Sequence, residues 1–204
     1  MTEEINIKVI LIGSSGTGKT NIIRAITNSS FDEDNNSTLA SSFVAKNINI
    51  DKRTYHIELW DTAGQEKFKS LTKIFVVDSK IVIFVYDITQ KKSFEELDYW
   101  VKVTKESLGD YPIYAVFGNK KDLYIDEEVD EEQGKRKAEE IGAYFRLTSA
   151  KTERENLNEY LNGLVKMFIN KYNKDNGEIY HREESFSLQY IKKNEKKTRC
   201  CEKS

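Results

Sequence analysis

The segment best suited to chemistry runs from Gly13 to Thr20 and has the pattern Gly-x-x-x-x-Gly-Lys-Thr. It follows an apolar run at 5–12, typical of a buried strand, and leads into a helical pattern over 19–27. In such a strand–loop–helix, backbone N–H groups of the loop and the positive end of the helix surround a polyphosphate. Lys19 is suited to neutralise the outer phosphates, and the Thr20 hydroxyl to ligate Mg²⁺. The alternative, a loop that only turns the chain, is disfavoured by this context.

A second polar segment, Asn-Lys-Lys-Asp at 119–122, follows an apolar run at 113–117. The Asp122 carboxylate can accept hydrogen bonds from the N1–H and 2-amino groups of guanine. Adenine has no equivalent pair of donors, which would leave the carboxylate desolvated at a cost of about 1–3 kcal/mol. The run 148–151 ends another expected strand and offers backbone N–H groups and the aliphatic stem of Lys151 to the same base. Ligands of open α/β sheets bind at the carboxyl ends of parallel strands, so we expect a guanine site here.

A third segment, 60–66, reads Trp-Asp-Thr-Ala-Gly-Gln-Glu and ends an alternating strand pattern. Asp61 can hold a water bound to Mg²⁺, and Gly64 lacks a Cβ, so its N–H can approach a γ-phosphate. Gln65 carries both a donor and an acceptor and can orient a water for in-line attack. We therefore expect Gln65 to be the catalytic residue. The alternative is an ordinary loop with a glycine turn.

Short apolar runs alternate with helical patterns along most of the chain. The expected strands are 5–12, 43–50, 54–60, 81–86, 113–117 and 143–147. The expected helices are 19–27, 93–107, 131–141 and 153–169, with Ser93 as an N-cap. The second and third strands flank a turn at 51–52 and form a hairpin, and 81–86 is apolar on both faces. This alternation predicts an α/β fold, a mostly parallel six-stranded sheet with helices on both faces.

The overall composition excludes several classes of protein. The chain has 204 residues, a net charge of −2 and a mean hydropathy of −0.64. We expect one domain over 1–171 and a flexible tail over 172–204, and the near-neutral charge gives no basic field for nucleic acid. The longest apolar run, 81–86, is far shorter than the about 20 residues of a membrane span. The two cysteines are adjacent, at 200–201, and the two histidines lie far apart, which argues against disulfide scaffolds and Cys/His metal sites.

Five stretches of the chain carry a resemblance to a known family. They lie at 56–66, 67–72, 84–89, 93–100 and 118–123. With these stretches, the chain resembles a small GTPase of the Ras superfamily, and within it a Rab, over about residues 5–170. The resemblance implies a three-layer P-loop NTPase G domain that binds GTP or GDP with Mg²⁺. It also implies slow hydrolysis of GTP to GDP and phosphate in the absence of an activating protein.

The resemblance implies further contacts at matching positions. Thr38 would ligate Mg²⁺ and sense the γ-phosphate, Phe31 would stack against the guanine edge, and Asn119 and Lys120 would brace the base and its loop. The expected nucleotide contacts are then Ser15, Gly16, Thr17, Gly18, Lys19, Thr20, Asn21, Phe31, Thr38, Gly64, Asn119, Lys120, Asp122, Ser149, Ala150 and Lys151. The expected metal contacts are Thr20, Thr38 and, through a water, Asp61.

Two segments depart from the Rab pattern. Residues 39–43 read Leu-Ala-Ser-Ser-Phe where a Rab usually reads Ile-Gly-Val-Asp/Glu-Phe. Residues 75–79 read Phe-Val-Val-Asp-Ser in place of Tyr-Tyr-Arg-Gly-Ala, and Ile81 replaces a frequent Gly. These positions face effectors in the family, so the departures concern the partner more than the chemistry. Two explanations of these departures stay open: sequence divergence without a change of role, and a specialised partner.

The end of the chain resembles a lipidation signal. Cys200 and Cys201 in a Rab-like protein imply two geranylgeranyl groups, added through an escort protein. The segment 192–199 holds five basic residues and one acidic residue, a net charge of +4 that would attract an anionic membrane surface. Glu202 and Lys203 are not aliphatic, which argues against ordinary C-a-a-X prenylation. The alternative is a Lys-rich tail with two incidental thiols.

The function implied by the resemblance is a nucleotide-dependent switch in membrane trafficking. The expected location is the cytoplasmic face of an intracellular membrane, in exchange with the cytosol. The expected partners are an exchange factor, a GTPase-activating protein, effectors, the escort protein and a GDP-dissociation inhibitor. We expect a monomer that binds no nucleic acid. The alternatives are a GTP-binding scaffold with little turnover and, less compatible with Asp122, a P-loop ATPase or small kinase.

Overall fold

The computed structural model describes residues 6–27, 42–62 and 72–174, with only the backbone at 42, 72, 73 and 174. The chain divides into two compact units, 1–166 and 167–204. The first unit contains the sheet described below. The division falls inside the last helix, and the predicted boundary between 171 and 172 stays a prediction.

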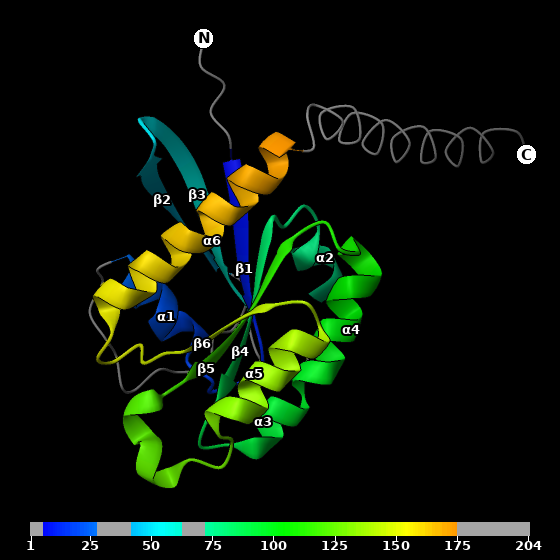
Figure 1. The fold of residues 1–204 in the computed structure, drawn as a ribbon, viewed down its shortest axis with the longest axis vertical. Coiled ribbons are helices and arrows are strands. Elements are labelled where there is room, and N and C mark those ends of the chain that lie inside the picture. The colour runs from blue at the N-terminus through cyan, green and yellow to red at the C-terminus, as the bar shows by residue number, and fades with distance from the viewer. Residues whose placement is uncertain (1–5, 28–41, 63–71, 175–204) are drawn as a thin grey trace, which may run out of the picture. The chain divides into compact units, whose positions relative to one another are not determined.

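Six strands form one sheet in the order β2-β3-β1-β4-β5-β6 (Figure 1). Only β2 and β3 pair antiparallel, and the other neighbours are parallel. The strands are β1 (Asn6–Ile12), β2 (Ser42–Ile50), β3 (Arg53–Asp61), β4 (Ile81–Asp87), β5 (Ile113–Asn119) and β6 (Tyr144–Leu147). The predicted α/β class and the six-stranded, mostly parallel sheet are confirmed.

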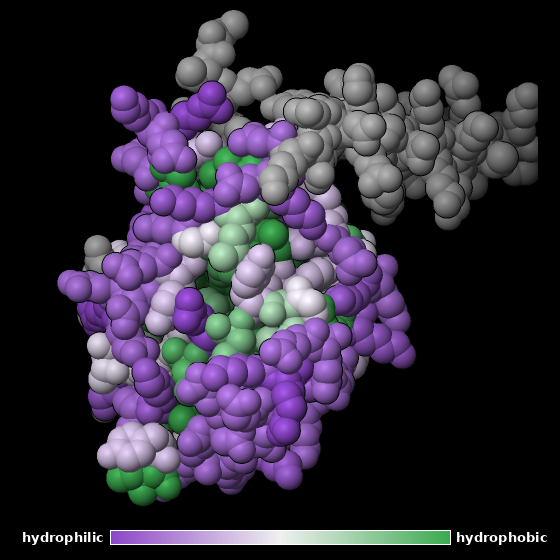
Figure 2. Space-filling view, viewed as in Figure 1, coloured by the Kyte–Doolittle hydropathy of each residue, from purple (hydrophilic) through white to green (hydrophobic). Residues whose placement is uncertain are grey.

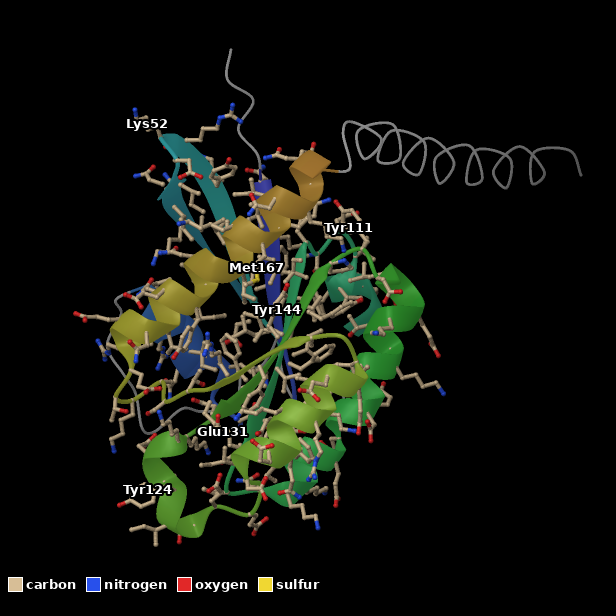
Figure 3. All side chains as sticks on the ribbon, in the orientation of Figure 1. Lys52, Tyr111, Tyr124, Glu131, Tyr144 and Met167 are labelled. Carbon is tan, nitrogen blue, oxygen red and sulfur yellow. The ribbon has the colours of Figure 1, made fainter. Side chains whose placement is uncertain are left out.

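The β2–β3 hairpin turns through only two residues. Asp51 and Lys52 both have positive φ, 48° and 65°. Two-residue hairpin loops favour this backbone because its twist matches the twist of the flanking strands. Lys52 stands at the tip of the hairpin in Figure 3, so the predicted turn at 51–52 is correct.

Helices cover both faces of the sheet. They are α1 (Lys19–Ile26), α2 (Thr72–Val76), α3 (Lys91–Glu95), α4 (Leu97–Leu108), α5 (Glu131–Glu140), α6 (Arg154–Lys174) and the 3₁₀ helix η2 (Lys121–Asp126). On one face, Leu97 and Trp100 of α4 and Ala138 of α5 pack in a cluster with Phe84 and Val116 of the sheet. On the other face, Lys46 Nζ of β2 donates to the Ile26 carbonyl of α1 (2.6 Å) and to Asn158 Oδ1 of α6. Figure 1 shows these two sets of helices on opposite sides of the strands.

The helix predicted over 93–107 is two helices, α3 and α4, and Ser93 is not an N-cap. Ser93 lies inside α3, where its Oγ donates to the Gln90 carbonyl (2.7 Å) and accepts from the Asp87 N–H (3.0 Å). The hydroxyl therefore ties α3 to the end of β4 instead of capping a helix. In addition, α6 extends beyond the predicted end at 169 to Lys174.

Two short helices have no counterpart among the predicted elements. α2 lies between β3 and β4, where no helix was expected, and its Val76 is fully buried. η2 exposes three successive apolar side chains, Leu123, Tyr124 and Ile125. Figure 2 shows them as a pale and green projection on a largely hydrophilic face, where Figure 3 labels Tyr124. Both helices are too short for a sequence period to reveal them.

The centre of the sheet is β4, in which every residue is buried. Parallel strands bring their carboxyl ends to the same edge, and Asp87, at the end of β4, lies opposite Asn119, at the end of β5. The chain enters η2, α1 and the 148–153 segment from this edge. Among the described residues, no helix combines the length and the apolar character that a membrane span requires.

Candidate nucleotide-binding site

The loop between β1 and α1 is shaped by glycines. A Cβ at Gly13 would lie 2.0 Å from the carbonyl oxygen of Val85, so the loop packs directly on the backbone of β4. Gly16 and Gly18 have φ of 78° and 91°, a left-handed region that side chains rarely adopt. α1 begins after Gly18 without a side-chain cap. Its first backbone N–H groups are therefore suited to bind an anion, as the sequence predicted.

Lys19 is nearly fully buried beneath this loop. Its Nζ donates to the carbonyl oxygens of Gly13 (2.9 Å) and Ser14 (2.8 Å). Burial lowers the pKa of Lys19 to about 8, and the negative charge of Asp61 opposes part of that shift. Within the described part of the chain, the hydrogen bonds of this buried ammonium go to neutral carbonyls, so its charge is incompletely compensated. It would gain from an anionic ligand in the loop, which fits a phosphate group.

Thr20 of α1 and Asp61 of β3 meet beside the loop. The Thr20 hydroxyl donates to Asp61 Oδ2 (2.6 Å), and Asp61 is buried. Hydroxyl and carboxylate oxygens are ligands that Mg²⁺ prefers. Among the residues that the structure describes, no group of three His, Cys, Asp or Glu side chains could hold a metal by itself. The pair therefore fits a Mg²⁺ ion that takes its remaining ligands from water and phosphate.

Asn119 connects three segments of the chain. Its Nδ2 donates to the Thr17 carbonyl of the phosphate loop (2.9 Å), and its Oδ1 accepts from the Ala150 N–H (3.2 Å). Gly18 leaves room for this side chain, because a Cβ there would lie 2.3 Å from Asn119 Nδ2. The expected phosphate and base segments are thus adjacent in the fold.

Asp122 is oriented by the third of these segments. Ser149 Oγ donates to Asp122 Oδ1 (2.5 Å) and accepts from the Thr152 N–H (3.1 Å). The backbone N–H of Ser149 in turn donates to Glu153 Oε2 (3.1 Å). The hydroxyl uses one carboxylate oxygen of Asp122, and the half-buried carboxylate keeps further acceptor capacity for a pair of N–H donors.

The structure brings together most of the predicted nucleotide contacts at one edge of the sheet. These are Ser15, Gly16, Thr17, Gly18, Lys19, Thr20, Asn21, Asn119, Lys120, Asp122, Ser149, Ala150 and Lys151, with Asp61 for the metal. Phe31, Thr38, Gly64, Gln65, Cys200 and Cys201 lie outside the described residues. The individual roles of all these residues stay predictions.

Sequence reasoning missed two acidic residues at this edge. Glu96, between α3 and α4, accepts a hydrogen bond from Ser14 Oγ of the phosphate loop. Asp87 forms an ion pair with Lys120, with 2.6 Å between Oδ2 and Nζ. Asp87 directly follows the predicted strand 81–86, and that position could have revealed it. Glu96 carries no such signal, because only the fold brings it to Ser14.

The comparison with known families decides the class of nucleotide. The Ras family profile matches residues 8–170, which contain the whole of this site. The chain belongs to the Ras family. Ras-family proteins are small GTPases that bind GTP and GDP, typically with Mg²⁺, and that act with exchange factors and activating proteins. The family therefore supports guanine nucleotide as the ligand, and the edge where β1, β3, β4, β5 and β6 end is the candidate site for it.

Proposed function

We propose that this small GTPase is a Rab-like switch of membrane trafficking that binds GTP tightly and hydrolyses it slowly. The observation that carries the nucleotide part is the position of Asn119, which joins the phosphate loop at Thr17 to the 148–151 segment at Ala150. The Rab part rests on the sequence stretches named above and on the cysteine pair, Cys200 and Cys201.

In the proposed mechanism, Lys19 and the first N–H groups of α1 hold the β- and γ-phosphates. Thr20 and Asp61 would hold Mg²⁺, whose charge neutralises the phosphate oxygens. Asp122 and the 149–151 segment read the guanine base. Gln65 orients the attacking water, so it contributes positioning more than proton transfer.

The switch would act through contacts to the γ-phosphate. With GTP bound, Thr38 and Gly64 hold the segments 31–43 and 62–79 in one arrangement, and hydrolysis removes those contacts. We expect slow intrinsic turnover, because stabilising the charge of the transition state calls for an arginine near the γ-phosphate. The sequence positions of Arg24 on α1 and Arg53 at the start of β3 do not place either one there. An activating protein would supply that charge.

The divergent segment 75–79 combines core and surface positions. Val76 is fully buried, and Phe75 packs against the core cluster beside α4. Val77 is exposed, and Asp78 has φ 62° where the Rab pattern has Gly. Asp tolerates this left-handed backbone better than most residues. The buried positions therefore keep a packing role, and the change at Val77 favours an altered partner.

The departures at Val77 and Asp78 favour, as a second candidate, a GTP-holding scaffold with little turnover. Single-turnover release of phosphate from protein loaded with GTP separates the two candidates. The switch predicts slow but complete release, and Gln65→Leu should slow it further while GTP affinity stays nearly unchanged. A Gln65→Leu protein that releases phosphate at the unmodified rate would contradict water positioning by Gln65.

The nucleotide part is tested by competition at the loaded site. Excess GDP should displace a fluorescent GDP analogue from the full-length protein, whereas excess ATP should not. Chelation of Mg²⁺ should accelerate release, because Thr20 and Asp61 then lose their shared ion. Equal displacement by ATP would point to the P-loop ATPase or kinase alternative.

The membrane part is tested in cells. A tagged full-length chain should carry prenyl mass and collect on an intracellular membrane, whereas the double variant Cys200→Ser/Cys201→Ser should stay in the cytosol. Two chains anchor stably where one anchors only marginally, so each single variant should show intermediate membrane binding. Absence of prenyl mass would favour incidental thiols.

A further inference from the structure

Asp87 is a fully buried carboxylate that the mechanism above does not use. It ends β4, at 0% exposure, opposite Asn119 in the register of β4 and β5. A buried carboxylate is unfavourable unless it is paired and hydrogen-bonded. Its partners therefore show which neighbouring group it stabilises.

Thr89 fixes the orientation of the Asp87 carboxylate. Asp87 Oδ1 accepts hydrogen bonds from the backbone N–H of Thr89 (3.0 Å) and from Thr89 Oγ1 (2.8 Å). The backbone N–H of Asp87 donates to Ser93 Oγ (3.0 Å). One carboxylate oxygen is thus held by the turn after β4, and the other, Oδ2, lies 2.6 Å from Lys120 Nζ.

Lys120 is the residue that this carboxylate restrains. Its backbone is left-handed, with φ 68° and ψ 33°, and its side chain is 31% exposed. A lysine side chain carries a compact charge on a flexible four-carbon stem, so without a fixed partner it samples many rotamers. The ion pair with a buried and oriented carboxylate selects a narrow set of them.

Two other polar residues of the 119–122 segment are also held by hydrogen bonds. Asn119 is held by Thr17 and Ala150, and Asp122 by Ser149. We propose that Asp87 is a positioning residue of the nucleotide site, which holds Lys120 in the conformation that braces the guanine base. This inference rests on the proposed role of Lys120 in binding guanine nucleotide.

A positioning role makes a prediction that a purely structural role does not. If Asp87 acts through Lys120, substituting Asp87 should not change nucleotide release further in a protein that already lacks Lys120. If Asp87 only stabilises the end of β4, the two substitutions should act independently. The interaction between contacting residues is measured by such a double-mutant cycle.

The experiment follows release of a fluorescent GDP analogue from the full-length protein into excess GDP. Asp87→Asn should accelerate release about tenfold, within the range of coupling between contacting residues. Lys120→Met should have a similar effect, and the double variant should release no faster than Lys120→Met alone. Additive effects in the double variant would overturn the inference.

Asp98→Asn is the matched control, because it removes another ion pair, Asp98 with Lys137 (3.0 Å), between α4 and α5. It should leave the release rate unchanged. Equal rates for Asp87→Asn and Asp98→Asn would overturn the inference. If wild-type protein retains no guanine analogue, the proposed function fails instead, so the two failures are distinguishable.

A milder variant covers the case in which Asp87→Asn does not fold. Thr89→Ala removes the 2.8 Å bond that orients Asp87 and keeps both charges. It should accelerate release about twofold to threefold in the wild-type background and not at all in the Lys120→Met background. Unchanged release from Thr89→Ala in the wild-type background would overturn the inference.

Discussion

The phosphate loop and the base-recognition segments lie at the same edge of the sheet but are held in place by different means. The phosphate loop depends on close backbone packing, with Gly13 against the Val85 carbonyl and a buried Lys19 bonded to main-chain oxygens. The base segments depend on side-chain hydrogen bonds between residues from separate strands, Asn119 to Ala150 and Ser149 to Asp122. Substitutions in the phosphate loop should therefore change the affinity for any ligand that carries phosphate. Substitutions in the base segments should change only the affinity for guanine nucleotides.

The largest effect should come from Gly13→Ala. Its Cβ would lie 2.0 Å from a backbone oxygen, so β1 or β4 must move, at a cost of about 3 kcal/mol in the free energy of unfolding. Gly16→Ala is the matched control. Apart from its chain neighbours, no atom of the described residues lies within 4 Å of a Cβ placed there, and φ of 78° adds only about 1 kcal/mol of strain. Urea unfolding with saturating GDP measures the free energy of unfolding of both variants. Equal losses of stability in Gly13→Ala and Gly16→Ala would contradict the packing argument.

The next effect should come from Asp122→Asn at the base end. It removes a charged acceptor of two N–H groups, so GDP should bind about 50-fold more weakly. The new amide can donate to the 2-oxo group of xanthine, so the affinity for a xanthosine nucleotide should rise. Competition titrations measure this preference. A uniform loss for every base would show that Asp122 acts on the phosphates or the fold.

A smaller effect should follow from the pKa of Lys19, which burial lowers to about 8. The phosphates of GDP favour the charged ammonium form of Lys19. Above pH 8, GDP binding is therefore accompanied by uptake of a proton on Lys19, so the affinity for GDP falls as the pH rises. GDP should bind about tenfold more weakly at pH 9 than at pH 7. Guanine also loses its N1 proton in this alkaline range, so the contribution of Lys19 is the difference between the unmodified protein and Lys19→Met. Lys19→Met should bind more weakly throughout and lose that contribution.

The smallest effect should come from Ser149→Ala. It removes the 2.5 Å hydrogen bond that orients Asp122 but leaves the carboxylate, so GDP affinity should fall about fivefold. The loss should disappear in the Asp122→Asn background, where there is no carboxylate to orient. Ser107→Ala is the control, because that hydroxyl bonds the Val103 carbonyl within α4 (2.9 Å) and lies outside the candidate site. An equal loss in the Ser107 variant would mean that the assay reports stability alone.

The contrast between the two regions also explains which parts of the site could be predicted. The phosphate loop is contiguous, so Gly13 to Thr20 could be identified from spacing and from the strand and helix that flank it. Asn119, Asp122 and Ser149 could be placed nearby because parallel strands bring their carboxyl ends together. The strands and long helices followed from hydrophobic periodicity. The errors fell where a tertiary contact overrides a local pattern, as at Ser93, whose hydroxyl serves Asp87 and Gln90.

The sequence by itself determined the order of the strands and of the longer helices and the residue types of the candidate nucleotide site, because periodicity and spacing are local properties of the chain. The tertiary structure decided the partners of those residues. Glu96 reaches Ser14 and Asp87 reaches Lys120 only because the sheet and helices close these distances. The buried state of Lys19, and with it the lowered pKa, has the same origin. Side-chain pairing between distant segments depends on packing in three dimensions, which no local pattern specifies.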